Sequence, residues 1–365
     1  CRAFACSNRR DSKKSVAQKG LGKNMRIILD TMGSDNGSYE FVKGAVLAAE
    51  DLDIDLVLVG DEKELCAHLS KEDPQGKYRK NISVIHAGEI VDMHDDPLKV
   101  MKEKPDSSMT VALRTLSEGK GDALVSAGNT GALLTQATLI VKRIRGIRRA
   151  ALAPVIPSAT GIAVLIDSGA NAECTPEYLY QFALMGSYYA EHALGVKSPK
   201  VGLLNNGAEE HKGDEVHREA NRILTEAGAR GEINYIGNIE GRDGPLGKAD
   251  VIVADGFSGN VYLKTMEGVG LFFARELKNM FMASLKGKIA GLMVKGNIAE
   301  FKKKIDYNDA GGAPLLGVKK PVIKAHGSSK AKSIYHCIIQ AIDYIDSGMT
   351  IHLERSLKGE NATNE

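Results

Sequence analysis

Short apolar runs alternate with helical patterns along almost the whole chain, and this alternation restricts its fold more than any other feature. The runs, among them RIILD, DLVLVG, IAVLID and VIVADG, have the length and composition of buried strands. Between them, apolar residues recur with the helical period in seven segments: residues 39–52, 107–118, 130–144, 176–194, 214–227, 260–284 and 329–348. The sequence therefore predicts an α/β fold, with a mostly parallel sheet between helices on both faces (α/β/α).

Small and polar residues follow nearly every expected strand. The stretches are DTMGSD, SAGNTG, DSGAN, NNGAEEHKG, GNIEGRD, DGFSGN and KAHGSS. Ligands of open parallel sheets bind at the carboxyl ends of the strands. We therefore expect these ends to meet in one composite cleft.

The stretch SAGNTGALL is the first candidate for binding a ligand. It places Ser126, Gly128, Asn129, Thr130 and Gly131 where a strand turns into a helix. Free backbone N–H groups and the helix dipole favour an anion at such a junction. The alternative is an ordinary strand–helix turn with Thr130 as the N-cap. Neither the Walker pattern nor the GxGxxG dinucleotide pattern is present here.

Two later junctions carry charged side chains. ADGFSGNVYLKT places Asp255, Asn260 and Lys264 at the start of a helix, and the alternative there is an N-cap followed by a solvated lysine. VIKAHGSSKAK brings together a lysine, a histidine and two hydroxyls just before another helix. The candidates from this stretch and from the remaining strand ends are Lys324, His326, Ser328, Ser329, Asp167, Asn171 and Lys212.

The charge distribution argues against a nucleic-acid partner. The chain has 48 basic and 46 acidic residues, but residues 1–24 hold seven of the basic ones and one acid, which leaves a mildly acidic body. We expect residues 1–24 to be a disordered, dispensable leader or expression remnant. Residues 25–348 are expected to form a single catalytic domain and residues 349–365 a tail. Five cysteines, an odd number without a CxxC pair, fit a reducing cytosol better than a disulfide framework. HAGEIVDMHDDP matches no metal-binding pattern, so no metal is expected.

In their order, these stretches resemble the bacterial phosphate acyltransferases. The matching pieces include MRIILDTMGSD, PDSSMTVALRTLSEGKGDALVSAGNTGALL, VGLLNNGAEEHKGDE, ADVIVADGFSGNVYLKTMEG and GGAPLLGVKKPVIKAHGSS. The chain departs from the family pattern at Thr31, Ser34, Asn206 and Ala208. The resemblance implies a fold like that of isocitrate and isopropylmalate dehydrogenases. It also implies an early reaction of phospholipid synthesis, in which fatty acyl-acyl carrier protein and inorganic phosphate give acyl phosphate.

The resemblance further implies a cytoplasmic homodimer in peripheral contact with the membrane and with a downstream glycerol-3-phosphate acyltransferase. Three other functions remain as alternatives: a phosphotransacetylase or phosphotransbutyrylase acting on acyl-CoA, a decarboxylating dehydrogenase, and a non-enzymatic scaffold. The first would differ in its donor. The second would need a nucleotide site, which the sequence does not show, and the third would cleave no thioester.

The implied chemistry allocates roles to the candidate residues. Phosphate and a thiol leaving group need little acid–base help, so the site must cradle an anion, donate to an oxyanion and align two substrates without a cofactor. We expect Lys324 and Lys212 to neutralise phosphate and His326, with Asn260 or backbone N–H groups near Ser328, to donate to the oxyanion. The hydroxyl and amide groups of SAGNTGALL would help to hold phosphate. Asp255 and Asp167 would orient the basic groups.

The segment 270–296 is too apolar for a simple surface helix and predicts a helical hairpin, within a protrusion of about residues 260–304. We expect Gly287 to end its first arm. The alternative is a hairpin buried in a dimer interface. We expect both: the lower turns pair with a partner subunit, and the tip contacts lipid, flanked by lysines that suit an anionic surface. The expected lipid contacts are Phe281, Met282, Leu285, Ile289, Leu292 and Met293.

Overall fold

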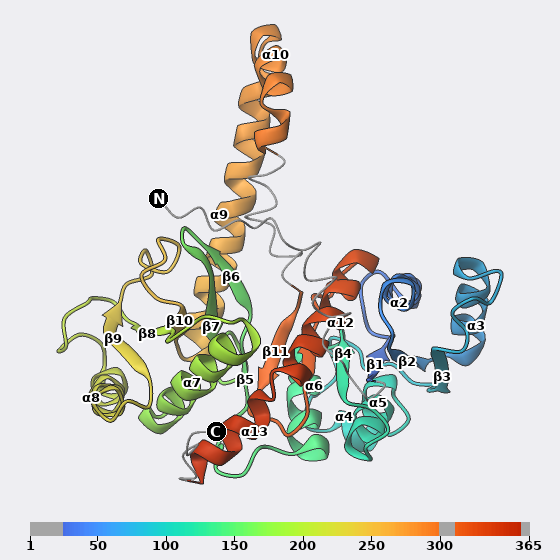
Figure 1. Cartoon of the computed structure of the whole chain (residues 1–365), viewed down its shortest axis with the longest axis horizontal. Helices are drawn as coiled ribbons and strands as arrows, with labels where there is room; N and C mark the ends of the chain where they lie inside the picture. The colour runs from blue at the N-terminus through green and yellow to red at the C-terminus, as the bar shows by residue number, and fades with distance from the viewer. Residues whose placement is uncertain (1–24, 299–310, 359–365) are drawn as a thin grey trace.

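The computed structural model describes residues 25–298 and 311–358, and the expected leader lies outside these residues. The described chain forms two lobes, each built around its own sheet, with a long helical hairpin projecting from between them (Figure 1). The expected α/β architecture is confirmed. The strands, however, divide between two sheets, which the pattern of strands and helices along the chain could not show.

The first sheet contains seven strands in the order β3-β2-β1-β4-β12-β11-β5. Its centre is parallel, and β11 is antiparallel to both of its neighbours. Hydrophobic side chains of the central strands are completely buried, as expected for a sheet covered on both faces. The bounds are β1 Arg26–Asp30, β2 Asp55–Gly60, β3 Ile82–His86, β4 Ala123–Ser126, β5 Ala151–Leu152, β11 Ala313–Leu316 and β12 Val322–Lys324.

The second sheet contains five strands in the order β6-β7-β10-β8-β9. It is parallel except for β6, which forms an antiparallel hairpin with β7. Gly161 has a φ of +137° in the turn of this hairpin, a conformation that side chains disfavour. The bounds are β6 Val155–Ser158, β7 Gly161–Ile166, β8 Lys200–Leu204, β9 Asn234–Ile239 and β10 Val251–Val253.

The two sheets meet where the chain passes from β5 to β6. Strand β5 is antiparallel to β11, which is itself antiparallel to β12, so β5 runs in the same direction as β4 and β12. The same segment pairs with β7 in the opposite sense, through Ser168 N–H to Leu152 O and Leu165 N–H to Pro154 O. At their junction the strands of the two sheets therefore point in opposite directions. The polar strand ends consequently form two groups, one for each sheet.

Helices cover both sheets, and one continuous hydrophobic core joins the lobes, because Ile27 of β1 and Val164 of β7 belong to the same buried cluster. The two predicted helices 130–144 and 176–194 each begin as α-helix and end in a π-helical turn, η1 Ala137–Val141 and η2 Tyr189–Ala193. The α-helical bounds are α2 Ser38–Asp51, α3 Glu62–Glu72, α4 Val100–Glu103, α5 Ser108–Ser117, α6 Thr130–Gln136, α7 Pro176–Tyr188, α8 Glu215–Ala229 and α12 Ala331–Asp346.

The C-terminal segment differs from the predicted tail. Residues Met349–Leu357 form helix α13, which begins after Gly348 in the left-handed conformation. Met349 and Leu353 are completely buried in the core that joins the lobes. The packed fold therefore continues at least to Leu357, and the expected boundary at residue 348 was too early.

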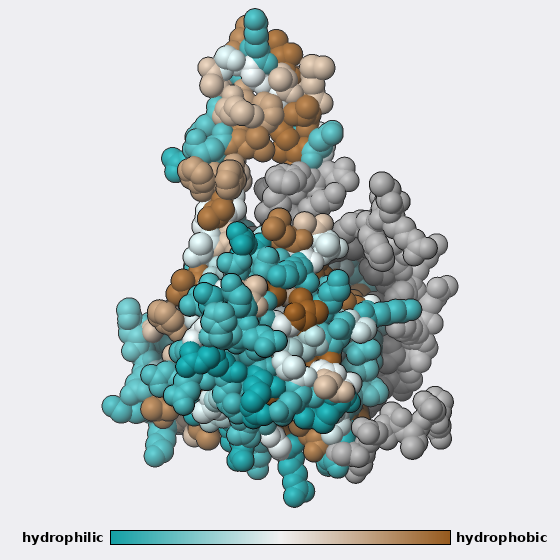
Figure 2. Space-filling view, turned by 90° about the vertical axis from the view of Figure 1, so that its left-hand side faces the viewer, coloured by the Kyte–Doolittle hydropathy of each residue, from teal (hydrophilic) through white to brown (hydrophobic). Residues whose placement is uncertain are grey.

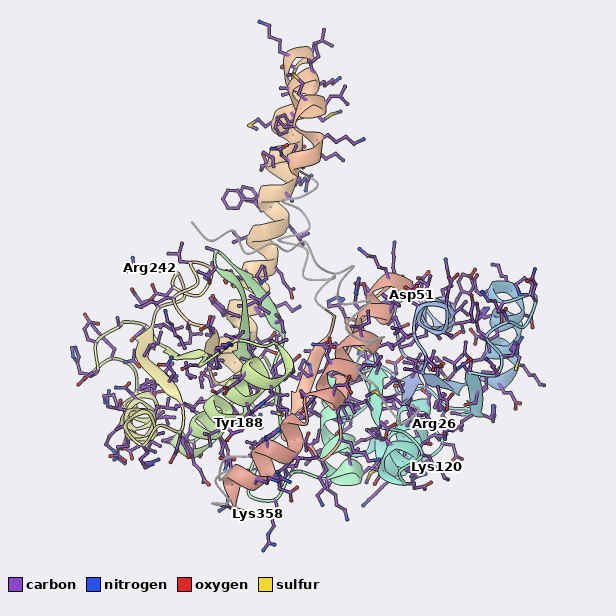
Figure 3. The ribbon with its side chains drawn as sticks, viewed as in Figure 1. Arg26, Asp51, Lys120, Tyr188, Arg242 and Lys358 are labelled. Atoms are coloured by element: carbon purple, nitrogen blue, oxygen red, sulfur yellow. The ribbon has the colours of Figure 1, made fainter. Side chains whose placement is uncertain are left out.

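The projecting hairpin consists of α9 Gly256–Met282 and α10 Leu285–Met293. At 1.5 Å per residue, α9 is about 40 Å long. The first arm ends at Met282, earlier than the predicted Gly287, because Ser284 caps α10 by accepting a hydrogen bond from Gly287 N–H at 3.0 Å. Side chains along the outer part of the hairpin point into solvent (Figure 3), and apolar ones form a band on its exposed surface (Figure 2).

Candidate active site

A buried carboxylate ends β1 and is held by two serine hydroxyls. Asp30 Oδ1 accepts from Ser108 Oγ at 2.5 Å, and Asp30 Oδ2 accepts from Ser126 Oγ at 2.7 Å. Burial raises the pKa of Asp30 to about 6, although the two hydroxyls and the charge of Lys324 act in the opposite direction. Asp30 is not among the residues predicted for the site. The available signal was an acidic residue directly after an apolar strand.

Lys324 ends β12, opposite Ser126 of β4 in the parallel register. Its Nζ donates to Ala325 O at 2.6 Å and to Ala127 O at 3.3 Å. An ammonium group has three protons, so one remains for a ligand. Burial lowers the pKa of Lys324 to about 8, against the opposing effects of Cys337, Asp30 and Asp35. Lys324 therefore combines a largely desolvated position with a positive charge near neutral pH.

His326 follows Lys324 by two residues and is held in one tautomer. Ser328 N–H donates to His326 Nδ1 at 3.2 Å, and Ser328 Oγ lies 2.8 Å from the same atom. Because a backbone N–H can only donate, Nδ1 is an acceptor and the proton of the neutral ring lies on Nε2. Burial, with the charges of Lys264 and Lys324, lowers the pKa of His326. The side chain therefore presents a neutral N–H donor at the exposed end of this turn.

A segment after β1 supports the turn that carries His326. Asn36 Nδ2 donates to the carbonyl oxygens of Ser328 at 2.8 Å and Ser329 at 3.2 Å, and Asp35 N–H donates to Gly327 O at 3.0 Å. A Cβ on Gly327 would lie 2.8 Å from the Asp35 carboxylate. Ser329 is buried under the turn, whereas Ser328 is exposed beside the imidazole.

The loop SAGNTGALL has a different internal arrangement from the one predicted. Asn129, rather than Thr130, caps α6: its Oδ1 accepts from Ala132 N–H at 3.0 Å. Its Nδ2 donates to Asp92 O and Met93 O, each at 3.2 Å, so its amide is engaged in joining two loops. Gly131 lies against Pro97, where a Cβ would approach within 2.9 Å. The groups of this loop that face Asp30 and Lys324 are therefore Ser126 and the backbone around Gly128.

Asp167 has a local structural role at the end of β7. Its carboxylate accepts from the N–H groups of Leu152, Ala170 and Asn171, and from Asn171 Nδ2. Burial nevertheless raises its pKa. These bonds join the loop after β7 to β5, so the carboxylate of Asp167 is occupied by backbone donors. The predicted role of Asp167 in orienting a lysine has no counterpart in these contacts.

Helix α9 connects the two groups of strand ends. Its first turn packs against the loop after β7, where a Cβ on Gly259 would lie 1.9 Å from Asp167 O. Asp255 caps the helix by accepting from Ser258 N–H at 2.8 Å, and the Asn260 side chain lies next to Gly169. One turn further on, Lys264 forms an ion pair with Glu267 at 2.8 Å, and its charge lowers the pKa of both Lys324 and His326. Lys264 therefore belongs with the group around His326, and Asn260 lies between the groups.

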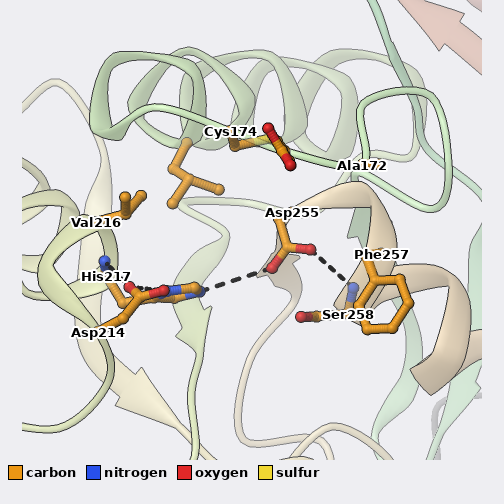
Figure 4. A pocket seen from close by; sticks show the side chains of 10 residues that line it. Ala172, Cys174, Asp214, Val216, His217, Asp255, Phe257 and Ser258 are labelled. Carbon is orange, nitrogen blue, oxygen red and sulfur yellow. Dashed lines mark hydrogen bonds and ion pairs between the residues drawn. The ribbon is translucent and has the colours of Figure 1, made fainter.

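A pocket of about 590 Å³ lies at the second group of strand ends, between the starts of α7, α8 and α9 (Figure 4). His217, which sequence reasoning missed, has its Nδ1 2.8 Å from Asp214 and its Nε2 3.8 Å from Asp255. Burial raises the pKa of Cys174, on the opposite wall, to about 12, so this cysteine is a thiol near neutral pH. Lys212 lies in the loop after β8, where Asn205 Nδ2 donates to its carbonyl oxygen at 3.2 Å. Lys212 thus belongs to the five-stranded lobe and Lys324 to the other.

Within residues 25–298 and 311–358, no group of three or more His, Cys, Asp or Glu side chains has the geometry of a metal site. The cysteines Cys66, Cys174 and Cys337 are free. The described residues offer a lysine ammonium and a neutral imidazole N–H, beside a buried carboxylate held by two hydroxyls, and these two donors suit an anion.

Comparison with known proteins identifies the family. A family model described as "Fatty acid synthesis protein" matches residues 25–352. The phosphate acyltransferase of Alkaliphilus oremlandii is 45% identical over 333 residues, which cover 91% of this chain and 97% of the relative. That of Bacillus subtilis is 40% identical, covering 92% of this chain and 99% of the relative. The chain belongs to the phosphate acyltransferase family.

Solved structures show the same fold at much lower identity. A phosphotransacetylase from Streptococcus pyogenes aligns with a TM-score of 0.64 at 18% identity, over 94% of this chain and 99% of that one. EutD phosphotransacetylase from Staphylococcus aureus aligns with a TM-score of 0.57 at 16% identity, over 93% and 98%. A 4-hydroxythreonine-4-phosphate dehydrogenase from Salmonella typhimurium reaches 0.50 at 14% identity, over 88% and 99%. The likeness to a dehydrogenase agrees with the predicted fold type.

Proposed function

We propose that the chain transfers a fatty acyl group from the thioester of acyl carrier protein to inorganic phosphate. A phosphate oxygen attacks the thioester carbonyl carbon, a tetrahedral oxyanion forms, and the C–S bond then breaks to give acyl phosphate and the carrier thiolate, which takes up a proton. Membership of the phosphate acyltransferase family, over more than nine-tenths of the chain, carries this proposal.

The site around β1, β4 and β12 suits this reaction. Phosphate is largely ionised near neutral pH and a thiol leaving group has a pKa of about 8.5, so charge stabilisation and alignment matter more than proton transfer. Lys324 supplies a desolvated positive charge for phosphate, and the free Nε2–H of His326 supplies a donor for the oxyanion. Asp30 accepts from Ser126 Oγ, which in turn accepts from Gly128 N–H, so Ser126 and Gly128 shape the wall beside Lys324 in this proposal.

The remaining predicted residues keep narrower roles in this proposal. Asn260 and Lys264 approach the same site from α9, and Ser328 holds the His326 tautomer. Asn129 and Asn171 shape their loops through backbone contacts, and Asp255 starts α9. Lys212 lies among the strand ends of the five-stranded sheet. It would contact substrate only if the acyl donor extended from these strand ends to those of the seven-stranded sheet.

The test uses the purified chain with palmitoyl-acyl carrier protein or palmitoyl-CoA, with and without phosphate, and measures free thiol and acyl phosphate. We expect phosphate-dependent thiol release from the carrier-protein donor. Release from the CoA ester alone would replace the proposal with a phosphotransacetylase, and release from neither would leave a scaffold. Removing one oxyanion donor costs about 10²-fold or more in rate, so we expect losses of that size in His326→Ala and Lys324→Ala. Wild-type turnover in both folded variants would refute these roles.

We also propose that the chain works as a cytoplasmic homodimer in peripheral contact with the membrane, where its product would pass to a glycerol-3-phosphate acyltransferase. No helix of the described residues is long and apolar enough to cross a bilayer. The exposed hairpin supports the proposal: Leu285 is 77% and Met293 81% exposed, with Lys286 and Lys288 beside them. Phe281 is removed from the proposed lipid contacts, because its ring packs against Gly291 of the other arm of the hairpin.

A further inference from the structure

Five basic side chains crowd the short segment that connects η1 to β5. This segment, residues 142–149, is called the basic loop below. It reads KRIRGIRR, and Lys142, Arg143, Arg145, Arg148 and Arg149 are all exposed. Like charges so close together repel one another, and the ion pair found for these five is that of Arg148 with Glu177, at 3.3 Å. Exposed charge of one sign, with a single ion pair to the described residues among its five members, attracts an acidic partner to this surface.

The basic loop is a fixed structure, not a floppy connection. Ile144 and Ile147 are buried, and they divide the exposed cations into Lys142 with Arg143, Arg145 alone, and Arg148 with Arg149. Ile144 N–H donates to Gly317 O at 2.9 Å, and Gln181 both donates to Gly146 O at 3.0 Å and accepts from Arg148 N–H at 2.8 Å. The exposed cations are thus presented in a defined arrangement, which lowers the entropy cost of binding a partner.

The position of the basic loop argues for a partner in solution. In Figure 1 the loop is the green segment at the lower edge of the molecule, beside α13, whereas the hairpin tip lies at the opposite end. A Cβ on Gly146 would lie 3.7 Å from the side chain of Leu357, the last residue of α13, so the basic loop is next to this helix. Lys358, at the end of α13, is labelled at the same lower edge in Figure 3. A flat membrane touching the tip could not reach this face.

The basic loop also borders the pocket at the second group of strand ends. Arg149 lies over the Tyr178 ring, 5.7 Å from its centroid, and its charge acts on Cys174, which lines the pocket. Arg148 pairs with Glu177 in the first turn of α7, whose Leu179 also lines the pocket. A protein held on the basic loop would therefore sit at the rim of a cavity that contains the start of α9.

We propose that the basic loop is the docking surface for an acidic face of the acyl carrier protein. The inference rests on the proposed function, because that function requires a protein to deliver the acyl group. Complementary charge would steer the carrier to this face, at the amino edge of the seven-stranded sheet, and hold it there. The acyl-bearing arm would then extend between the lobes, along the start of α9, to Lys324 and His326 at the carboxyl edge. A phospholipid surface is the competing ligand for clustered lysine and arginine, and the test includes it.

The test uses a double variant of the basic loop, Lys142→Glu together with Arg145→Glu, and compares it with a matched control variant. Neither side chain makes a hydrogen bond or ion pair with the described residues, so the fold should persist. The control is Lys63→Glu with Lys80→Glu, which changes the net charge equally on exposed residues around α3, next to β3 at the far edge of the seven-stranded sheet from β5. For the loop variant we expect KM for acyl-carrier protein to rise about tenfold with kcat nearly unchanged, since steering acts on encounter. KM for acyl-CoA should not change.

A binding measurement separates docking from catalysis. Fluorescence anisotropy with labelled, unacylated carrier protein should show wild-type binding that weakens as salt rises, and weaker, less salt-sensitive binding by the loop variant. Equal binding by loop variant and control would overturn the docking surface. So would loss of sedimentation with anionic vesicles in the loop variant while its carrier KM stays normal. Absence of phosphate-dependent thiol release by the wild type would overturn the proposed function instead, and the anisotropy would still decide the docking.

Discussion

Asp30 and Lys324 illustrate how burial and charge oppose one another at single residues. Each is largely removed from water, which disfavours its charged form, and each is partly compensated by the other. The carboxylate is also fixed by Ser108 and Ser126. A desolvated lysine next to a carboxylate of raised pKa is an arrangement that active sites use to keep a cation available for an incoming anion.

We predict that Asp30→Asn moves the alkaline limb of activity to lower pH. The ammonium of Lys324 is the active form, so kcat/KM for phosphate should fall as pH rises through about 8. Asp30, Asp35 and Cys337 raise the pKa of Lys324 and Lys264 lowers it, so removing the Asp30 charge must lower it further. The measurement is the pH profile of kcat/KM for phosphate.

Ser108→Ala is the control for this profile, because it removes a hydrogen bond to Asp30 but keeps the carboxylate. Its alkaline limb should stay near the wild-type position. Titration of phosphate itself is common to all three enzymes and cancels in the comparison. An Asp30→Asn profile that superimposes on the wild type would show that this carboxylate does not act on Lys324.

Sequence reasoning found residue types better than residue roles. Lys324, His326 and Ser126 lie at one edge of the seven-stranded sheet, because parallel strands bring their carboxyl ends together whatever the details of the loops. Lys264 approaches them from α9 of the other lobe. Asn129 and Asp167 show the other use of short polar side chains at strand ends, because both form hydrogen bonds with free backbone groups. Only the three-dimensional contacts of such a side chain show whether it binds a ligand or satisfies backbone groups. His217 was missed although Asp214 precedes it by three residues, because the second carboxylate beside it, that of Asp255, is distant in sequence.

At the scale of elements, the start of α9 depends on glycine. Gly256 and Gly259 allow the helix to lie against the backbone of the loop after β7, and Gly256 N–H donates to Asn171 O at 2.7 Å. This contact fixes the direction of the whole hairpin and places Asn260 and Lys264 relative to the first lobe. The boundaries of the seven predicted helices agree with the structure within a few residues, whereas α3 was not predicted. The close approach of α9 to the loop could not be predicted either, because its only sign in the sequence is the two glycines.

We predict opposite effects of two glycine-to-alanine changes in α9. Gly259→Ala puts a methyl group 1.9 Å from Asp167 O, where backbone must move, so unfolding free energy should fall by about 3 kcal/mol or more. Gly268→Ala, on the same helix, meets no atom within 4 Å and should stabilise the helix by about 0.5–1 kcal/mol. Thermal or urea unfolding measures both. A Gly259→Ala protein as stable as the wild type would show that α9 can shift away from the loop at little cost.

At the scale of the whole molecule, the division into two lobes could not be predicted from the strand pattern. Strands β5 and β6 are short, and they join sheets whose directions oppose one another at the junction. The expected single cleft therefore becomes two groups of polar strand ends, connected by α9. The same helix extends beyond both lobes into the hairpin, so the hairpin tip and the basic loop lie at opposite ends of the molecule (Figure 1).

The hairpin is long enough to make two different contacts, which we expected from the sequence. A partner subunit would pack along its arms, and lipid would contact its tip. Exposed apolar side chains occur on both parts, with Phe272 and Phe273 along α9 and Leu285, Ile289 and Leu292 at the tip. We predict that Leu285→Glu with Ile289→Glu reduces sedimentation with anionic vesicles about tenfold, because carboxylates resist burial at an apolar–anionic interface. Dimer mass by analytical ultracentrifugation and activity in solution should persist. Leu246→Glu with Ile351→Glu, at exposed sites off the hairpin, should leave vesicle binding unchanged. If the tip variant instead became monomeric, or sedimented like the wild type, the tip would be part of the subunit interface.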